Sequence, residues 1–339
     1  MKPARGGAPP TPRAGRRATH AQRLHPEIPD ACGSLRSLSQ VDNLEVWFQR
    51  ASDVMRKMRA GDLDLGIVGY DMFVELGQGD EDLIVVHDAL AFGQCHLAVA
   101  VPQGWDNVNS MDDLKALGWS AARPMRVVTG YTHIAKEFFA SAGMPHVALS
   151  TADGALEAAP AMGSADVILD LVSSGTTLRE NNLKQIAGGR VLESQGCLVA
   201  SRRALLQRPG ALDVVRDMIE RLEAHLRAEG QFLVTANMRG SSPAEVAAAL
   251  AAGGPLLTGL QGPTIGSIYT APGGGAPPAP GTFFSATLCV PRRQIYDAVK
   301  AMRRAGGSGV LVSPLTYIFD EEPPRWRALQ RTLGLEPSS

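Results

Sequence analysis

Residues 157–182 read EAAPAMGSADVILDLVSSGTTLRENN, and this stretch is the most informative part of the chain. The apolar run VILDLV predicts a buried strand, SSGTTL a loop of small hydroxyl residues with a flexible glycine, and LRENNLKQI the helix that follows. A strand, loop and helix in this order aim successive backbone N–H groups and a helix N-terminus at one point. The stretch therefore predicts an α/β fold with a loop suited to a phosphate dianion.

Carboxylates stand directly before this loop. Asp170 falls near the C-terminal end of the expected strand, where open α/β sheets bind ligands. With Glu157 or Asp166 it can hydrogen-bond ribose hydroxyls, or share a Mg²⁺ ion with a pyrophosphate, because hard cations prefer oxygen ligands. A phosphorylated sugar is the ligand that this combination favours.

The loop alone also has a plainer interpretation. SSGTTLRE can simply turn a strand into a capped helix, with Thr176 or Thr177 as the N-cap and Glu180 completing a capping box. Capping boxes are common at helix starts. The loop residues by themselves leave both interpretations open.

The wider pattern resembles the signature of the ATP phosphoribosyltransferase family, which catalyses the first step of histidine biosynthesis. The signature positions are Glu157, Gly163, Asp166, Asp170 and Ser174-Gly175-Thr176-Thr177-Leu178. Other segments match the family in the same order: LEVWFQRASDV at 44–54, GDLDLGIVGYD at 61–71, FGQCHLAVAVP at 92–102, RVVTGYTHIAKEFF at 126–139, VLESQGCLVASR at 191–202 and GGSGVLVSPLTYIFDEEPPRW at 306–326. The resemblance covers about residues 41–339. Within it, the amino-acid sequence is similar to that of the plant and algal branch of the family.

The resemblance implies a two-lobed α/β catalytic region of the periplasmic-binding-protein-like (type II) class, with the active site between the lobes. The first lobe would comprise residues 41–119 and 193–230, and the second residues 120–192. Apolar periodicity agrees with αβ alternation, including a helix SDVMRKMRAG capped by Ser52 or Asp53 and ended by Gly61. Residues 231–339 show a βαββαβ-like order, which predicts a ferredoxin-like α+β domain.

The resemblance further implies a magnesium-dependent glycosyltransferase that joins N1 of the adenine of ATP to 5-phosphoribosyl 1-pyrophosphate and releases pyrophosphate. Glu157 and Asp170 are the catalytic candidates and also the candidate Mg²⁺ ligands. The candidates for binding phosphoribosyl pyrophosphate are Asp166, Ser173, Ser174, Gly175, Thr176, Thr177 and Leu178. Catalysis in such a site is mainly positioning and electrostatic stabilisation.

Six residues are candidates for the ATP side of the cleft. They are Arg50, Gly69, Tyr70, Asp71, Thr129 and Tyr131. An arginine can bind a triphosphate as a bidentate donor, and Tyr131 can stack on adenine. Asp71 is equally well explained as a helix N-cap. The histidines at 87, 96 and 133 are expected to be packing or solvent residues, because no metal-ligand spacing or general base is indicated.

The C-terminal domain resembles the regulatory domain of the long-form enzyme, which binds histidine as a feedback inhibitor. Gly262, Pro263 and Thr264 match the inhibitor-site loop, although Gly266 and Ser267 depart from the family pattern that follows it. The proline- and glycine-rich segment 271–281 is expected to be a hairpin extension. The family implies a homo-oligomer, a dimer or hexamer.

Composition fits an ordinary enzyme. The 339 residues predict two or three domains, and 45% hydrophobic residues suffice for real cores. A net charge of −1 argues against a nucleic-acid binder, and no apolar run approaches the ~18 residues of a membrane span. The four widely spaced cysteines indicate neither a zinc site nor a disulfide framework, so a reducing compartment is expected.

The first forty residues differ from the rest. Residues 1–26 carry six Lys or Arg and no acidic residue, which predicts an organellar transit peptide and a plastid stromal location; otherwise the protein is cytoplasmic. A disordered tail is the alternative. The family's first strand and Lys-Gly-Arg loop have no match before Val41, so the chain as given is expected to be inactive or poorly folded. A catalytically impaired, histidine-sensing or small-molecule-binding subunit is therefore the alternative function.

Overall fold

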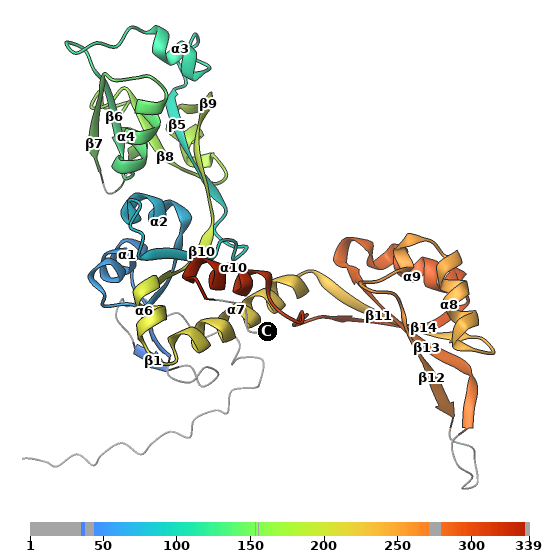
Figure 1. The fold of residues 1–339 in the computed structure, drawn as a ribbon. Helices are drawn as coiled ribbons and strands as arrows, with labels where there is room; N and C mark the ends of the chain where they lie inside the picture. The colour runs from blue at the N-terminus through green and yellow to red at the C-terminus, as the bar shows by residue number, and fades with distance from the viewer. Residues whose placement is uncertain (1–34, 38–43, 153, 155, 271–278, 336–339) are drawn as a thin grey trace, which may run out of the picture.

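The computed structural model describes residues 35–37, 44–152, 154, 156–270 and 279–335. The expected transit-like segment, apart from residues 35–37, and most of the expected 271–281 extension lie outside these ranges. Figure 1 shows three bodies: two lobes stacked one above the other, and a C-terminal domain beside the lower lobe. The two-lobed region with a separate α+β domain agrees with the expected fold class.

The upper lobe, lobe II, is a mixed five-stranded sheet in the order β7-β6-β8-β5-β9. Its strands are β5 (Cys95–Pro102), β6 (Met125–Thr129), β7 (Val147–Thr151), β8 (Val167–Val172) and β9 (Leu183–Ser194). Its helices are α3 (Met111–Ala116), α4 (Thr132–Ser141), the 3₁₀ turn η2 (Leu156–Ala158) and α5 (Thr176–Glu180). β6 runs parallel to β7 and β8, whereas β5 is antiparallel to β8 and β9. The core lies between the sheet and α4, where Leu97, Val127, Leu169 and Phe139 are buried.

The lower lobe, lobe I, is a smaller antiparallel sheet in the order β3-β10-β4. Its strands are β3 (Leu65–Gly69), β4 (Leu83–His87) and β10 (Gly196–Ser201), and its helices are α1 (Ala51–Ala60), α2 (Tyr70–Gly77), α6 (Arg202–Gln207), α7 (Ala211–Ala228) and α10 (Pro324–Leu333). Val54, Met55 and Met58 form the buried stripe of α1, at the spacing of an amphipathic helix. A short strand pair, β1 (Leu35–Ser37) with β2 (Glu45–Trp47), precedes this lobe.

The chain crosses between the lobes twice. Residues 88–94 lead from β4 to β5, and Gln195 alone separates β9 from β10. Figure 1 shows β9 continuing downward into β10, so the two sheets share one long strand path. Two short crossings leave the lobes little freedom except to rotate about this hinge.

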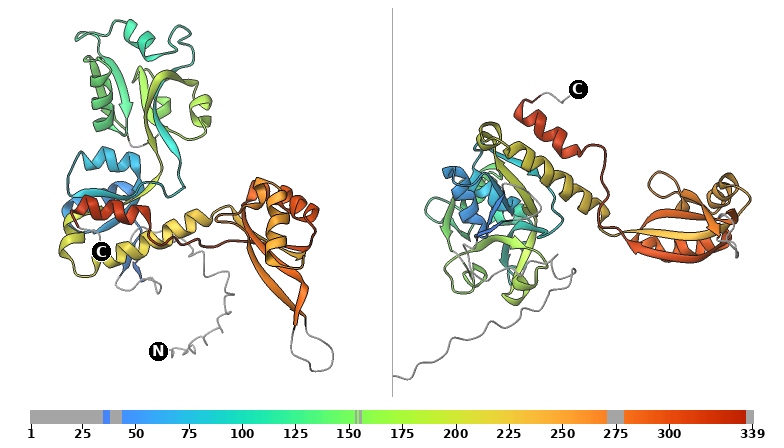
Figure 2. Two further views of the ribbon diagram at one scale, coloured as in Figure 1. Left: turned by 45° about the vertical axis from the view of Figure 1, so that its right-hand side comes forward. Right: turned by 90° about the horizontal axis from the view of Figure 1, so that it is seen from below.

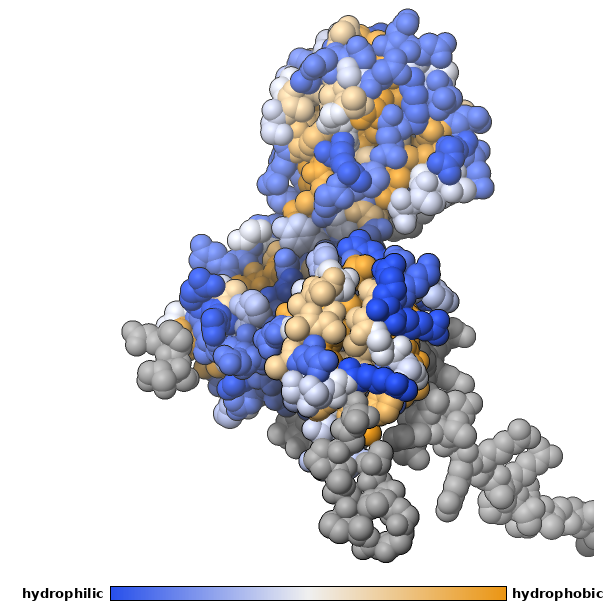
Figure 3. All heavy atoms as spheres, turned by 90° about the vertical axis from the view of Figure 1, so that its right-hand side faces the viewer, coloured by the Kyte–Doolittle hydropathy of each residue, from blue (hydrophilic) through white to orange (hydrophobic). Residues whose placement is uncertain are grey.

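The C-terminal domain has the order βαββαβ and the sheet order β12-β13-β11-β14, as a ferredoxin-like fold requires. Its elements are β11 (Gln231–Arg239), α8 (Pro243–Ala252), the 3₁₀ turn η3 (Pro255–Leu257), β12 (Thr264–Thr270), β13 (Ala279–Pro291), the 3₁₀ turn η4 (Arg292–Gln294), α9 (Ile295–Arg304) and β14 (Gly307–Pro314). It has its own core, with Val234, Leu250, Leu288 and Met302 buried together. Figure 3 shows the free end of this domain, with apolar surface between charged residues.

Several boundaries differ from the expected ones. β5 and α3 belong to the lobe II sheet, so this lobe spans about residues 95–194, whereas the sequence predicts residues 120–192. The helix α10 packs on lobe I, so the ferredoxin-like fold ends with β14 and is shorter than the expected 231–339. The cause is an apolar face on α10, formed by Trp326, Leu329 and Leu333, that the small C-terminal sheet does not cover.

Two local expectations also need correction. Helix α1 starts after Arg50, so Ser52 and Asp53 lie inside its first turn instead of capping it, whereas Gly61 ends it in the left-handed conformation as expected. The predicted helix LRENNLKQI is only the five residues Thr176–Glu180 long. Asn182 adopts a positive φ of 54° that ends the turn, and the alternating residues after it form β9.

Within the described residues, no helix is long and apolar enough to cross a membrane.

His87 is a buried histidine at the end of β4, with only 1% of its surface exposed. Its Nδ1 accepts the Ala89 N–H at 3.3 Å, so in the neutral ring the proton sits on Nε2, which is buried without a partner among the described residues. Burial first, and then the charge of Arg325, lower the pKa of His87 to about 4. Protonation is thus far harder in the folded chain than in the unfolded chain.

We expect His87 to make the fold sensitive to acid. Above pH 6.5, His87 is neutral in both the folded and the unfolded chain and does not make the free energy of unfolding depend on pH. Between pH 6.5 and about 4, His87 binds a proton in the unfolded chain but not in the folded chain, so the folded state loses stability as the pH falls. The wild-type protein should therefore lose on the order of 3 kcal/mol more stability from pH 7 to 4 than a His87→Leu variant, in urea unfolding. An exposed-site control, His146→Gln, should keep the wild-type pH slope. Equal slopes for wild type and His87→Leu would contradict the assignment.

Candidate active site

The loops at one edge of the lobe II sheet gather most of the predicted site residues. Because β6, β7 and β8 are parallel, their C-terminal ends meet at the same edge. The segments that follow these strands carry Tyr131, Glu157 and the loop 173–177. The antiparallel strands β5 and β9 begin and end at this edge, which adds His96 and Arg190. Both chain crossings to lobe I leave from here, so the edge forms one wall of the cleft.

The loop after β8 is held open by its own hydroxyls and an arginine. Gly175 adopts φ +70°, a conformation that side-chain-bearing residues rarely take. Ser174 Oγ accepts the Thr176 N–H at 3.3 Å and donates to Thr176 Oγ1 at 3.0 Å. Arg179 folds back and donates to Ser174 O at 3.3 Å and to Thr176 Oγ1 at 3.1 Å.

The capped-helix interpretation of this loop is wrong. The N-cap of α5 is Gly175, and no side chain caps the helix start. Thr176 and Thr177 are exposed and lie inside the first turn. The hydroxyls therefore remain at the surface of the site.

A hollow of about 280 Å³ lies against this loop. It is lined by His96, Gln103, Val172, Ser173, Ser174, Gly175, Leu178, Arg179, Leu183, Lys184 and Gln185. Two of these side chains, Arg179 and Lys184, are cationic, and Lys184 Nζ is held by Trp105 O and Asn109 Oδ1, both at 2.9 Å. Hydroxyls and fixed cations around a small polar hollow suit a phosphate.

Asp170 and Glu157 form an interacting carboxylate pair beside the loop. Burial, followed by the charge of Glu157, raises the pKa of Asp170, although the Leu171 N–H donated to its Oδ1 at 2.8 Å opposes this. A bound cation would relieve the repulsion between the two carboxylates. The described residues contain no group of three or more potential metal ligands. The pair therefore fits an ion whose other oxygen ligands come from a substrate.

Asp166 lies at the opposite end of β8 from this loop. Its carboxylate accepts hydrogen bonds from the Arg126 side chain at 2.8 and 3.2 Å and from the Arg126 N–H at 2.8 Å. Burial raises the pKa of Asp166, but the bonds from Arg126 outweigh it and the pKa is lowered. Seven residues of extended chain span roughly 23 Å, so Asp166 is a structural ion-pair partner and does not reach the loop.

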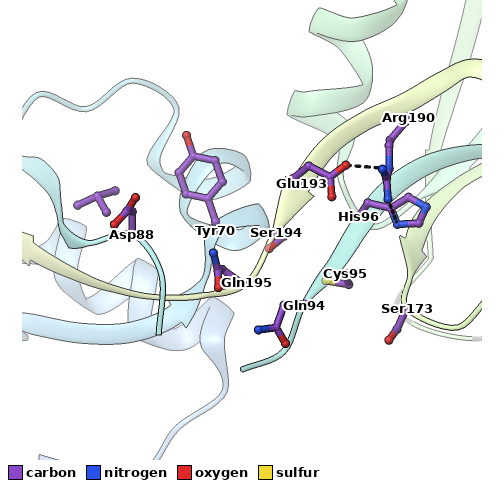
Figure 4. Close-up of a pocket in the computed structure, with 11 residues that line it drawn as sticks. Tyr70, Asp88, Gln94, Cys95, His96, Ser173, Arg190, Glu193, Ser194 and Gln195 are labelled. Carbon is purple, nitrogen blue, oxygen red and sulfur yellow. Dashed lines mark hydrogen bonds and ion pairs between the residues drawn. The ribbon is translucent and has the colours of Figure 1, made fainter. Parts of the chain in front are cut away.

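A larger cavity of about 660 Å³ opens at the hinge, between the lobes. It is lined by Tyr70, Val85, Asp88, Gln94, Cys95, His96, Ser173, Arg190, Glu193, Ser194 and Gln195 (Figure 4). His96 and Ser173 also line the smaller hollow, so the two spaces adjoin. A ligand with a phosphate in the smaller hollow can extend into the larger one.

His96 lines both spaces, and its hydrogen bonds fix its tautomer. Its Nδ1 lies 3.0 Å from Arg190 Nη2, and a guanidinium can only donate, so Nδ1 accepts and Nε2 carries the proton. Nε2 then donates to Gln185 Oε1 at 2.6 Å. Arg190 Nε is bound in turn to Glu193 Oε1 at 2.8 Å, as the dashed lines in Figure 4 show. His96 is therefore an oriented side chain in the wall of both spaces.

Asp71 and Tyr131, predicted for the ATP side, bind one another across the lobe interface. Tyr131 OH donates to Asp71 Oδ2 at 2.8 Å, and Ser194 Oγ donates to Asp71 Oδ1 at 2.5 Å. Asp71 is 4% exposed and Tyr131 8%. Burial, and then the Asp71 carboxylate, raises the pKa of Tyr131, which keeps the phenol a donor. Asp71 is not the helix N-cap, because Gly69 occupies that position.

Glu75, one turn further along α2, caps a helix of the other lobe. Its carboxylate accepts the N–H groups of His133 and Ile134, both at 3.0 Å, and the Thr132 hydroxyl at 3.4 Å. These groups form the first turn of α4, where N–H groups lack partners within the helix and the dipole favours a negative charge. Lobe I thus supplies the N-terminal cap of a lobe II helix.

The other predicted residues are dispersed. Arg50 is exposed at the start of α1 and lines neither cavity. A Cβ on Gly69 would stand 2.3 Å from Asp71 Oδ1, so this glycine makes room for the carboxylate. Thr129 is fully buried and accepts the Tyr131 N–H at 2.9 Å. Gly262, Pro263 and Thr264 lie at the start of β12, outside both cavities.

Sequence reasoning did not identify Glu75, His96, Arg179, Lys184 and Arg190. Arg179 carried a usable signal, because it stands three residues after Thr176, the spacing at which helical side chains meet. Lys184 lies only six residues after the loop, in a segment expected to be helical. Glu75, His96 and Arg190 come from strands or helices farther away in sequence, and no local pattern marks them.

Comparisons with known proteins place the chain in a family. Residues 50–224 match the family model of ATP phosphoribosyltransferase, and residues 228–317 match the model of its C-terminal domain. ATP phosphoribosyltransferase 1, chloroplastic, of Arabidopsis thaliana is 57% identical over 301 residues, which cover 88% of this chain and 72% of that protein. ATP phosphoribosyltransferase 2, chloroplastic, of the same plant is 56% identical over the same coverage. The ATP phosphoribosyltransferase of Bradyrhizobium sp. (strain ORS 278) is 34% identical, over 88% of this chain and 87% of its own.

We expect Glu75→Gln to loosen the first turn of α4, because the neutral amide is a weaker acceptor for two buried N–H groups. Exchange of the His133 and Ile134 amide protons should become about tenfold faster, the equivalent of ~1.4 kcal/mol. Lys136→Gln, on the exposed face of α4, should leave these rates unchanged. Unchanged rates in Glu75→Gln would show that the cap does not hold the lobes in solution.

Proposed function

Because the chain belongs to the ATP phosphoribosyltransferase family, we propose that its cleft joins ATP to 5-phosphoribosyl 1-pyrophosphate in the first step of histidine biosynthesis. The products are N1-(5-phosphoribosyl)-ATP and pyrophosphate. One observation carries the assignment to this cleft: the carboxylate pair Glu157 and Asp170, the hydroxyl loop and the cationic Arg179 that bonds to this loop all lie at one sheet edge. A ribose between a phosphate and a pyrophosphate needs all three.

The smaller hollow is the proposed site of the 5-phosphate. Ser173, Ser174, Gly175 and Leu178 line it. Backbone and hydroxyl groups of Ser174 and Gly175, and of Thr176 and Thr177 next to this lining, would donate to the phosphate. Arg179 and Lys184, which line the same hollow, would balance its charge. The ribose would then extend toward Asp170.

Glu157 and Asp170 are proposed to hold ribose hydroxyls and a Mg²⁺ ion. Their oxygens are the ligand type that Mg²⁺ prefers, and their mutual repulsion favours a cation. When bound, the ion neutralises the charge of the departing pyrophosphate. Asp170 would accept hydrogen bonds from the ribose hydroxyls in its ionised form.

The adenine is proposed to occupy the hinge cavity. There its N1 lone pair forms the bond to the anomeric carbon as the bond from that carbon to the pyrophosphate oxygen breaks. Tyr70 lines this cavity and offers an aromatic face to the base. Contact by Asp71 or Tyr131 would require their mutual hydrogen bond to open, and Arg50 would reach the triphosphate only from outside the cavity.

The ferredoxin-like domain is proposed to bind histidine as a feedback inhibitor, with Gly262, Pro263 and Thr264 in the pocket. Its separate core and its match to the family's C-terminal domain support a distinct role. Assembly into a homo-oligomer is proposed on family grounds. The plastid location is proposed from the basic N-terminal segment and from the chloroplastic relatives.

We expect replacing Thr176 and Thr177 together by valine to weaken phosphoribosyl pyrophosphate binding. Each hydroxyl that donates to a phosphate is worth ~1.5–3 kcal/mol, the range for bonds to charged groups. Calorimetry on the full chain measures this. Thr332→Val, which removes an exposed hydroxyl of α10, is the matched control. If the double variant bound phosphoribosyl pyrophosphate with unchanged affinity, the two hydroxyls would not be part of the phosphate site.

The unmatched first strand predicts an inactive chain, but the described residues form both lobes and the two cavities. We therefore expect the wild-type protein to form phosphoribosyl-ATP and pyrophosphate one to one, and Asp170→Asn to lower kcat on the order of a hundredfold with little change in KM. The reason is that a carboxylate near the anomeric carbon is used most as positive charge develops there. Asp112→Asn, with a side chain 93% exposed, is the control. No product from the wild-type protein would overturn the function, whereas normal turnover by Asp170→Asn would overturn only its role.

A further inference from the structure

The C-terminal helix α10 belongs physically to the catalytic region. Trp326, Leu329 and Leu333 are buried in the same core as Val86 of β4 and Ile219 of α7. Figures 1 and 2 both show α10 alongside α7 and well away from the C-terminal sheet. The family models match residues 50–224 and 228–317, so α10 lies outside both.

Arg325, in the first turn of α10, reaches the hinge between the lobes. Its Nε donates to Asp88 Oδ1 at 2.7 Å, and its Nη1 donates to Glu223 Oε1 of α7 at 3.0 Å. Asp88 is the first residue of the crossing segment 88–94. Burial raises the pKa of Asp88, but the hydrogen bond and charge of Arg325 outweigh this and lower it. Charge-assisted bonds of this kind are the stronger class.

Asp88 also lines the hinge cavity, in which Figure 4 shows it with Tyr70 and Gln195. The Asp88 side chain remains 70% exposed, whereas Glu223 is 14% exposed. Arg325 is therefore anchored on α7 through a largely buried carboxylate, and it holds an accessible carboxylate at the cavity wall.

The segment between β14 and α10 ties the C-terminal domain to the same place. The Ile318 N–H donates to Ala224 O at 2.9 Å, and Arg227 pairs with Asp320, so this segment runs along the end of α7. The domain is thus joined to lobe I by two chain connections, one into β11 and one out of β14. The second connection ends at Arg325.

We propose that Arg325 is a positioning residue for the nucleotide side of the cleft: it fixes Asp88 and the start of the hinge segment, so that α10 supports one wall of the hinge cavity from outside. The proposal builds on the proposed function in taking ATP as the ligand of that cavity. It gives the C-terminal helix a role in substrate binding that neither family model includes.

The test compares Arg325→Gln with Arg331→Gln in the full chain. Arg331 lies on the same helix, and its side chain bonds to Arg327 O of that helix. Arg325→Gln should raise KM for ATP about tenfold, the loss of a charge-assisted bond, and leave kcat and KM for phosphoribosyl pyrophosphate within about twofold. Arg325→Lys should recover part of the loss, because an ammonium can pair with Asp88 without bridging to Glu223. Arg331→Gln should behave as wild type.

Hydrogen exchange without substrate supplies a second readout. Amides of residues 88–94 should exchange faster in Arg325→Gln, and Asp88→Asn combined with Arg325→Gln should add nothing further. Wild-type exchange at 88–94, or an unchanged KM for ATP in an active Arg325→Gln enzyme, would overturn the proposal. A wild-type protein that forms no phosphoribosyl-ATP would overturn the proposed function, while the exchange result would still decide whether Arg325 positions the hinge.

Discussion

Helix α2 carries two carboxylates one turn apart, Asp71 and Glu75, and both are buried. A buried carboxylate is stable only when donors surround it, and here lobe II supplies them. Asp71 receives the hydroxyls of Tyr131 and Ser194, and Glu75 receives the free N–H groups of α4. The relative position of the two lobes follows from satisfying these two side chains.

The cleft follows from that arrangement. With the lobes held at α2 and crossed by two short segments, the sheet edge that carries Asp170 and the hydroxyl loop faces the hinge. Tyr131 and Asp71, obvious candidates for ligand contact from sequence, are used for holding the lobes. Ligand chemistry is left to side chains around them: Arg179 and Lys184 at the hollow, and the His96–Arg190 pair between the two cavities.

The sequence was sufficient for elements whose signals are local. The strand of β8, the Gly61 helix end and the ferredoxin-like order all follow from periodicity and punctuation, and the structure confirms them. The sequence was insufficient where a partner distant in sequence determines the role of a side chain. Asp166 and Asp170 look equivalent on one strand, but pairing with Arg126 removes the first from the site. Glu75 and Arg325 carry no local signal, because their partners are 58 and 237 residues away.

Phosphoribosyl pyrophosphate is proposed to bind where the lobe II sheet edge that carries Asp170 meets the hinge. Hydrogen exchange of the full chain with phosphoribosyl pyrophosphate and Mg²⁺, but no ATP, tests this central placement most directly. Protection should concentrate in residues 170–178 and extend to 93–96, since the smaller hollow and the hinge cavity adjoin at His96 and Ser173. Amides of the C-terminal sheet should gain no protection from the substrate. Protection confined to the C-terminal sheet, or absent from residues 170–178, would contradict the placement of the substrate in this cleft.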